Sequence, residues 1–477
     1  MSLRTNSFYF QAAIFSLIIA TNLIVRAADA PAAATPAASA PEVPMDPAMA
    51  ESVAKHAPLP NPAADGRILT ANIGKDVAPR SNRVTNHVSN YDERVAGNFT
   101  LPDVLTLSNG QPVKDADTWW KLRRPEILKV YEEEVYGKVP DSAPKITWEV
   151  TSTDPKTLSG AAVMKHVVGH VGDKTNPNAF DFAFDMYTPA NAKGPVPFFF
   201  ALMFGSSVDN PGTPIADIIA RGYGYGSVLY PTIEPEAAAA RRRTPGVIEA
   251  AFKPGQTEVA ADEWGCISAW AWTLSRIVDY LETDKDVDAK RVAIVGHSRL
   301  GKTVLWAGAQ DPRIAMILSS QSGEMGASLS RRDYGETIDD IATSLGYHFD
   351  ANFQKYIGHW NDLPVDAHML IALNAPRPVF VTGANYDTWS DPHGELLGEV
   401  FAEPVYKLLG APGLNLDKSQ MATDPRQIPM PPLDTPIMNG KLGYLYHNGG
   451  HFITPLDWKT FLDFADKNLK PAPAAQK

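Results

Sequence analysis

Cysteine is nearly absent from this chain, with one residue, Cys266, among 477. A single thiol cannot form an internal disulfide, so the burial of apolar side chains has to stabilise the fold. Hydrophobic residues make up 44% of the sequence, a share typical of globular proteins that bury a large core. Because Cys266 lies in an apolar segment of helical periodicity, we expect it to be a buried small residue and not a nucleophile.

Positive charge is scarce relative to negative charge. The chain carries 43 Lys and Arg residues against 54 Asp and Glu residues, which gives a formal net charge of -11 at pH 7. Phosphate backbones and anionic lipid surfaces repel such a chain, so no nucleic acid and no membrane surface is expected as a general partner. A charged pocket elsewhere on the surface remains compatible with this balance.

Long apolar runs are missing after the amino-terminal region. There, Arg4 precedes an apolar run over residues 8–25, and Ala-Asp-Ala follows at residues 28–30. This order is typical of a signal peptide, residues 1–30, and a retained anchor helix is the alternative. Export of a chain with one thiol predicts the bacterial periplasm or the medium as its location.

The remaining chain divides by composition. Residues 31–66 are rich in Ala and Pro and predict a flexible linker, and residues 67–477 predict a single folded domain. Strands are expected at 146–151, 164–170, 182–187, 196–204, 225–230, 292–295, 314–320, 378–382 and 444–447, and helices at 117–136, 215–221, 264–281, from 299 onward and at 458–468. Alternation of this length predicts an α/β fold in which helices cover both faces of a mostly parallel sheet.

The most informative stretch, residues 291–302, combines a β-branched strand, a glycine turn and the start of a helix. Gly296 permits a tight turn that lifts the hydroxyl of Ser298 above the edge of the sheet, as in a nucleophile elbow. The usual G-x-S-x-G pattern is altered, because Leu300 takes the place of the second glycine and the glycine follows at Gly301. A structural serine in a tight turn is the alternative to a nucleophile.

A nucleophilic serine needs a base, and in an α/β-hydrolase the base follows the last strands. His451 is the candidate, because it lies just past the last predicted strand and follows two glycines. His447 lies within that strand and is expected to be packed. We expect His297, His368 and His393 to be elbow-flanking, helical and loop residues.

Three carboxylates are candidates for the acidic residue that orients the base. Asp387 follows the penultimate strand, where the fold normally places the acid. Glu324 follows the strand directly after the elbow, and Asp391 lies further along the loop of Asp387. Asp387 is the preferred candidate on its position alone.

Two basic residues flank the serine on the predicted helix. The backbone N–H of Arg299 follows the nucleophile directly, and its guanidinium can add positive charge where an oxyanion forms. Lys302, one helical turn beyond Ser298, can face the same pocket. The alternative is a pair of surface charges.

Several motifs in a common order resemble the bacterial branch of the glucuronoyl esterases, carbohydrate esterase family 15. They are Gly-His-Ser-Arg-Leu-Gly-Lys at 296–302 and the segments 322–332, 363–378, 387–392 and 449–451. The resemblance implies an α/β-hydrolase fold, a three-layer αβα sandwich with a mostly parallel sheet. It also implies cleavage, without metal or cofactor, of the ester between lignin alcohols and the 4-O-methyl-glucuronate of glucuronoxylan.

The same resemblance assigns roles to single residues. It makes Ser298 the nucleophile, Arg299 the oxyanion arginine and His451 the base, and it matches Lys302, Glu336 and Trp389 to residues that contact the sugar. The chemistry agrees, because a carboxylate accepts from sugar hydroxyls, an ammonium donates to them and an indole face suits a pyranose ring.

One departure from the family pattern bears on the acid. The fungal branch places its acid immediately before the Ser-Gly that stands here at residues 322 and 323, and this chain has Gln321 there. An amide cannot serve as an anionic partner of the histidine, which favours Asp387. Glu324 stands where relatives often have a small residue or Cys, so it is kept as a secondary carboxylate near the histidine.

The resulting hypothesis is a secreted, monomeric serine esterase that acts through an acyl-enzyme. One alternative keeps the mechanism and changes the substrate to acetylxylan or another carbohydrate ester. The other alternative is a hydrolase-fold protein that binds glucuronoxylan without turnover.

Overall fold

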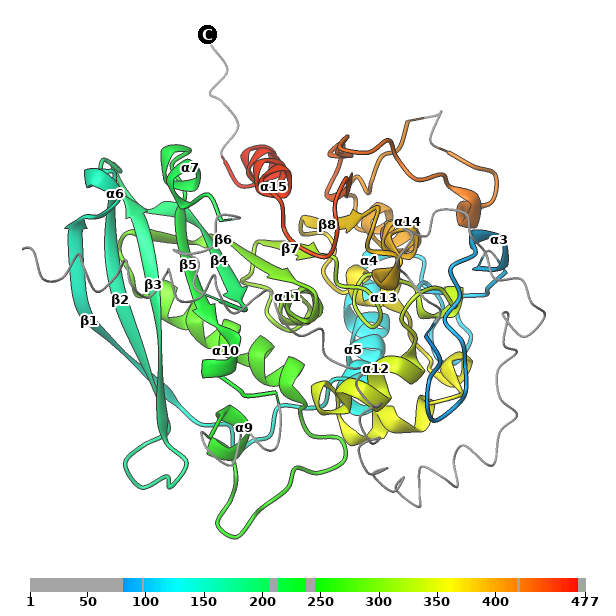
Figure 1. The fold of residues 1–477 in the computed structure, drawn as a ribbon, viewed down its shortest axis with the longest axis horizontal. Helices are drawn as coiled ribbons and strands as arrows, with labels where there is room; N and C mark the ends of the chain where they lie inside the picture. Colours follow the sequence, from blue (N-terminus) through cyan, green and yellow to red (C-terminus); the bar gives the residue numbers. More distant parts are fainter. Residues whose placement is uncertain (1–79, 97, 206–212, 237–244, 418–420, 471–477) are drawn as a thin grey trace, which may run out of the picture. The chain divides into compact units, whose positions relative to one another are not determined.

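The fold is organised around one mixed sheet. A computed structural model describes residues 80–96, 98–205, 213–236, 245–417 and 421–470. The predicted signal peptide, the predicted linker and the expected start of the domain at residue 67 lie outside these residues. Within them, nine strands form a single sheet in the order β1-β2-β3-β5-β4-β6-β7-β8-β9 (Figure 1).

The strands match the predicted runs closely. They are β1 (Ile146–Lys156), β2 (Ala162–Val171), β3 (Phe180–Pro189), β4 (Val196–Met203), β5 (Gly224–Leu229), β6 (Val287–His297), β7 (Met316–Ser320), β8 (Val379–Ala384) and β9 (Leu442–His447). The first three strands run antiparallel, and β3 also pairs antiparallel with β5. From β5 through β4 and β6 to β9 every pairing is parallel, so the expected mostly parallel sheet is confirmed.

Helices cover both faces of the sheet. The longer ones are α5 (Arg124–Glu134), α7 (Ile215–Ala220), α10 (Cys266–Leu281), α11 (Arg299–Gln310), α12 (Ile338–Leu345), α13 (Ala367–Ala372), α14 (Pro392–Leu408) and α15 (Pro455–Asn468). Alternate strand residues face two separate cores. One core joins β6 and β7 to α10, α11, α13 and α14, and the other joins them to α7 and α15. Because successive side chains of a strand point to opposite faces, continuous apolar strands supply both cores.

Two sequence predictions about helices need correction. The helix α14 was not expected, and His393, predicted in a loop, lies in its first turn. Pro404 inside this helix and its two glycines weaken the helical signal, while the Asp391 carboxylate caps its start by accepting from Gly394 N. The helix expected over 117–136 is divided by a π-helical turn at Trp119–Arg123.

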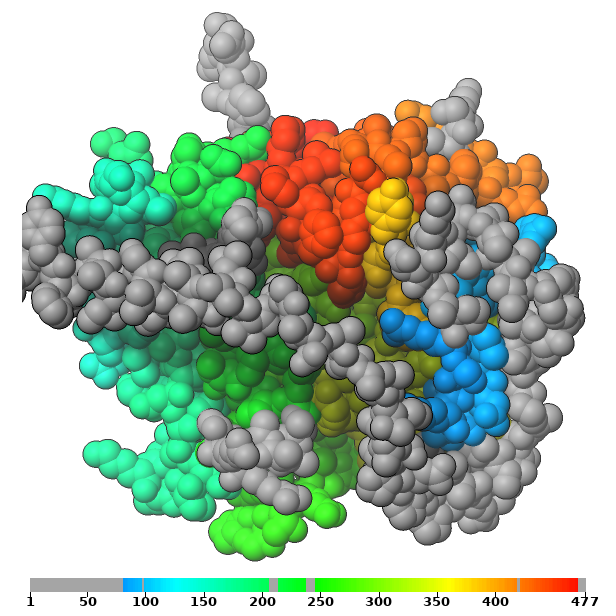
Figure 2. All heavy atoms as spheres, in the orientation of Figure 1, coloured from blue at the N-terminus to red at the C-terminus, as the bar shows by residue number. Residues whose placement is uncertain are grey.

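The carboxyl ends of the parallel strands bring distant segments together. Ser298 follows β6, Asp387 follows β8, and His451 follows β9. Figure 2 shows the carboxyl-terminal part of the chain, in red, at the surface beside the turquoise and green residues of the first half of the sheet. In an open parallel sheet this edge is where ligands bind.

Within the described residues, no helix is both long and apolar enough to cross a bilayer. Cys266 is fully buried in the first turn of α10, as the sequence predicted.

Candidate active site

Ser298 occupies a strained turn between β6 and α11. Its backbone has φ 58° and ψ -128°, a conformation that L-residues rarely adopt. The Ser298 N–H donates to the carbonyl of Ser320 at 2.9 Å, which ties the turn to the end of β7. A Cβ at Gly296 would lie 2.0 Å from the carbonyl oxygen of Leu300, so only glycine fits there. This is the backbone geometry of a nucleophile elbow.

Packing explains why the second glycine of the elbow stands at Gly301, one position later than usual. A Cβ at Gly301 would lie 2.9 Å from the Cβ of Ser322 and 3.1 Å from the carbonyl of Ser320. The first turn of α11 therefore lies against the strand that follows the elbow, and a side chain at this position would push the helix away. Leu300, in the usual glycine position, is fully buried.

His451 is paired with Asp387. The Nδ1 atom of His451 lies 2.7 Å from Oδ2 of Asp387, whose side chain is almost buried, while the imidazole is 43% exposed. The hydroxyl of Ser390 lies 3.5 Å from the same nitrogen. An ionised carboxylate accepts from Nδ1–H, and this leaves Nε2 as the free acceptor of the ring. The ring of His297 lies against that of His451, with 4.4 Å between centroids.

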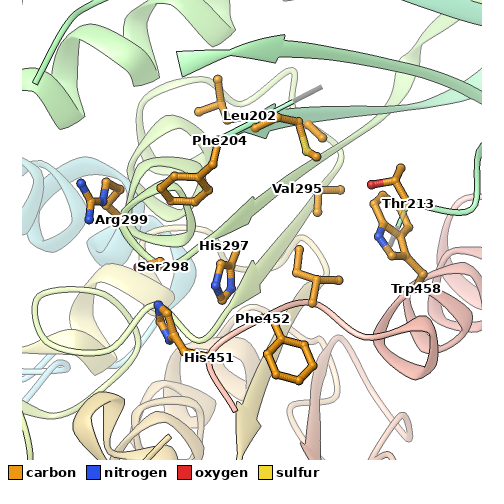
Figure 3. A pocket seen from close by; sticks show the side chains of 14 residues that line it. Leu202, Phe204, Thr213, Val295, His297, Ser298, Arg299, His451, Phe452 and Trp458 are labelled. Atoms are coloured by element: carbon orange, nitrogen blue, oxygen red, sulfur yellow. The ribbon is translucent and has the colours of Figure 1, made fainter. Parts of the chain in front are cut away.

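A cavity of about 400 Å³ joins the serine and the histidine. Ser298, Arg299 and His451 lie at one end of it and Trp458 at the other (Figure 3). Its walls are mostly apolar, and Phe204 and Phe452, both about half exposed, stand at its rim. A reacting ester can thus meet serine, imidazole and guanidinium in one space.

The guanidinium of Arg299 is itself held in place. Its Nη1 pairs with Glu236, which follows β5, and its centre lies 5.6 Å from the centroid of the Phe204 ring. The N–H of Arg299 belongs to the first turn of α11, where backbone donors have no partner within the helix. The partial positive charge at the amino terminus of α11 and the guanidinium of Arg299 therefore lie next to Ser298.

The predicted sugar-contacting residues lie near one another but outside the cavity. Lys302 is buried, and its Nζ donates to the carbonyl of Ser322 at 2.5 Å, so it is not a surface charge. Burial lowers the pKa of Lys302 and raises that of Glu336, and each group's charge opposes the other's shift. The N–H of Glu336 donates to the carbonyl of Trp389 at 2.8 Å. The guanidinium of Arg80 lies 4.2 Å from the centroid of the indole ring.

Glu324 and Gln321 contact other partners. Glu324 is buried and accepts a hydrogen bond from the Ser330 hydroxyl. Burial raises its pKa well above the ordinary value. The amide nitrogen of Gln321 lies 2.6 Å from Nε2 of His447 and donates to the carbonyl of Phe452 at 3.3 Å. In the described part of the chain, neither side chain forms a hydrogen bond or ion pair with His451, whereas Asp387 does.

Asp391, the third candidate acid, forms a buried ion pair with Arg332 at 2.8 Å and caps α14. In the described ranges no group of three or more His, Cys, Asp or Glu side chains is arranged to hold a metal ion.

Sequence reasoning missed Glu236 and its partners Tyr230 and His348. One signal was available, because Glu236 follows a parallel strand at the carboxyl edge that carries the site. No motif surrounds it, however, and a loop carboxylate is usually solvated.

Comparisons with known proteins identify the family of this chain. A family model described as fungal glucuronyl esterase matches residues 259–410, which include Ser298 and Asp387. Carbohydrate esterase MZ0003, from an unknown prokaryotic organism, is 36% identical over 415 residues, covering 80% of this chain and 92% of the relative. The chain belongs to the glucuronoyl esterases of carbohydrate esterase family 15.

Other members of the family extend this similarity. A solved glucuronoyl esterase from Solibacter usitatus is 41% identical with a TM-score of 0.71, covering 78% of this chain and 99% of that one. A 4-O-methyl-glucuronoyl methylesterase from Schizophyllum commune is 29% identical over 325 residues, covering 66% of this chain and 75% of the relative. The protein is thus an α/β-hydrolase-fold carboxylic ester hydrolase, and the family predicted from the motifs is confirmed.

Proposed function

We propose that the protein is a serine esterase that cleaves glucuronate esters through an acyl-enzyme. The observation that carries this proposal is the 2.7 Å contact between His451 Nδ1 and Asp387 Oδ2, beside a serine at the elbow. His451 takes the proton from the Ser298 hydroxyl, whose oxygen then bonds to the acyl carbon. Asp387 keeps Nε2 free for that proton and stabilises the imidazolium.

The oxyanion of the tetrahedral intermediate is stabilised by Arg299, through its backbone N–H and its guanidinium. His451 next donates its proton to the departing alcohol, and the C–O bond to that alcohol breaks. Water, deprotonated by the same imidazole, attacks the acyl-enzyme and releases the free acid and Ser298.

The acyl half of the substrate is proposed to be 4-O-methyl-glucuronate of glucuronoxylan, and the alcohol half a lignin alcohol. Lys302, Glu336 and Trp389 are the proposed sugar-binding residues, supported by the mutual electrostatic influence of Lys302 and Glu336. A polymeric substrate of this kind lies outside the cell, so secretion through the predicted signal peptide belongs to the same proposal.

Hydrolysis of benzyl glucuronate tests the function. We expect Ser298→Ala to lower kcat by about 10⁴-fold or more, because the covalent route is lost. A fluorophosphonate probe should label the wild-type chain and leave Ser298→Ala unlabelled. Hydrolysis at the wild-type rate by Ser298→Ala would exclude the mechanism. A faster reaction with acetyl esters than with methyl glucuronate would instead support the acetylxylan alternative.

A further inference from the structure

The guanidinium of Arg299 is anchored by a cluster that the reaction steps above do not use. Nη1 of Arg299 pairs with Oε1 of Glu236. The Tyr230 hydroxyl donates to Oε2 of the same carboxylate at 2.9 Å, and Nε2 of His348 lies 3.0 Å from Oε1. Donors from three separate segments therefore converge on one carboxylate.

The protonation states in this cluster follow from its contacts. Burial opposes ionisation of Glu236, but hydrogen bonds from His348 and Arg299 outweigh it and lower its pKa to about 2. Burial lowers the pKa of His348 to about 4, so the imidazole is neutral and donates its Nε2–H. Glu236 is thus a constant negative charge at neutral pH.

The pairing with Glu236 engages Nη1 of the Arg299 guanidinium. Its Nε is buried and has no hydrogen-bond partner in the part of the chain that the structure describes. The side chain lines the cavity beside Ser298, where a carbonyl oxygen of the substrate becomes negative. Arginine is rich in rotamers, and ordering such a side chain costs conformational entropy. Because Glu236 holds one end of the guanidinium, the side chain is already ordered before the substrate binds.

We propose that Glu236 is a positioning residue that, with Tyr230 and His348, sets the Arg299 guanidinium in the orientation that stabilises the oxyanion. This inference rests on the proposed function, in which Arg299 acts on the oxyanion. A donor that is already oriented favours the transition state over the ground state, because it does not reorganise as charge develops. The anchor therefore acts on kcat more than on KM.

The first test replaces Glu236 by an amide of the same size. Glu236→Gln keeps one acceptor oxygen, which can face either Tyr230 or His348, but loses the charge that holds Arg299. With benzyl glucuronate we expect kcat to fall about tenfold and KM to change less than about twofold, since removing an oxyanion donor altogether costs 10²–10³. Glu236→Asp, which keeps the charge, should recover part of the loss. A wild-type kcat for Glu236→Gln would overturn the proposal.

Glu282→Gln is the matched control. Glu282 also pairs with an arginine, Arg313, at 2.9 Å, but it lies at the end of α10 away from the cavity. This variant should retain the wild-type kcat. An equal loss of kcat in both variants would show a general effect of removing arginine partners and would overturn the proposal.

A double-mutant cycle separates positioning from a purely structural role. In the Arg299→Ala background, Glu236→Gln should change kcat by less than about twofold, because the group it orients is gone. A tenfold loss in both backgrounds would show that Glu236 acts without Arg299. Should Glu236→Gln fail to fold by circular dichroism, Tyr230→Phe removes one hydrogen bond of the anchor, and no fall in its kcat would overturn the proposal.

Failure of this inference is distinguishable from failure of the proposed function. Ser298→Ala, assayed alongside, reports on the function. An inactive Ser298→Ala with a fully active Glu236→Gln rejects the anchor alone. An active Ser298→Ala rejects the serine mechanism on which the anchor depends.

Discussion

Asp387 and Glu324 are both carboxylates near the elbow, yet only Asp387 touches the imidazole of His451. Glu324 is fully buried beside Ser330, and burial raises its pKa well above its ordinary value of 4.5. A carboxyl that holds its proton is neutral and cannot stabilise an imidazolium. Glu324 therefore lacks the position of an acid partner of His451, and the raised pKa favours its neutral form.

We expect Asp387→Asn to lower kcat by about 10³- to 10⁴-fold, because an amide no longer selects the tautomer of His451 with a free Nε2. Glu324→Gln should lower it by less than about tenfold, through local packing alone. Steady-state kinetics on benzyl glucuronate gives both values. The reverse ranking would transfer the role of the acid to Glu324.

At the residue level, the sequence placed the candidate serine, acid and histidine correctly relative to the strands. Ser298, Asp387 and His451 each follow a strand at the same edge of the sheet, and the alternation of strands and helices predicted that these strands are parallel. Glu236 could not be found in this way. Glu236 follows β5 and Arg299 follows β6, and the two side chains can meet because both strands flank β4. No local sequence pattern around Glu236 encodes this strand order.

Among the elements, the connection between β9 and α15 carries His451 and is held by neighbouring strands. Gln321, directly after β7, donates to the carbonyl of Phe452 and lies against His447 at the end of β9. Tyr386 N donates to the carbonyl of Gly449 on the opposite side of the connection, at 3.0 Å. Gln321 thus holds the loop of His451 through the backbone carbonyl of Phe452.

Gln321→Ala should therefore loosen this connection. We expect kcat to fall about tenfold, because small errors in the placement of a base are costly, and the free energy of unfolding to fall by about 1 kcal/mol for the lost hydrogen bond. Kinetics and urea denaturation measure the two effects. Gln427→Ala, an exposed glutamine on the short helical turn Pro425–Gln427, is the control. Wild-type kinetics for Gln321→Ala would contradict a supporting role.

Helix α14 escaped prediction for a physical reason. Helix α14 contains Pro404, and two of its glutamates, Glu395 and Glu399, are fully buried. Its polar residues therefore do not mark a solvent face, and the usual amphipathic pattern is obscured. The strands were found because their apolar, β-branched runs are dictated by burial on both faces.

At the scale of the whole molecule, these buried carboxyls make stability depend on pH. Burial raises the pKa of Glu399 well above its ordinary value of 4.5, and the charge of Glu395 adds to the shift. The folded protein therefore keeps this proton at pH values where the unfolded chain has released it. The stabilisation is fully present below about pH 4.5 and is lost as pH rises through the folded-state pKa.

Glu399→Gln removes this titration while keeping the side-chain size. Relative to the wild type, its free energy of unfolding should rise between pH 5 and pH 8, with a slope of at most about 1.4 kcal/mol per pH unit. Urea denaturation of both proteins at the two pH values measures the difference. The same difference at both pH values would show that Glu399 keeps an ordinary pKa in the folded state.

The sequence by itself determined the architecture and the family, because the alternation of strands and helices, the elbow glycine and the order of the serine, acid and histidine segments are local patterns. The tertiary structure decided which carboxylate meets His451 and which one holds Arg299. Those contacts join residues 64 and 63 positions apart in the chain, and only the packing of parallel strands side by side sets the distances between their ends.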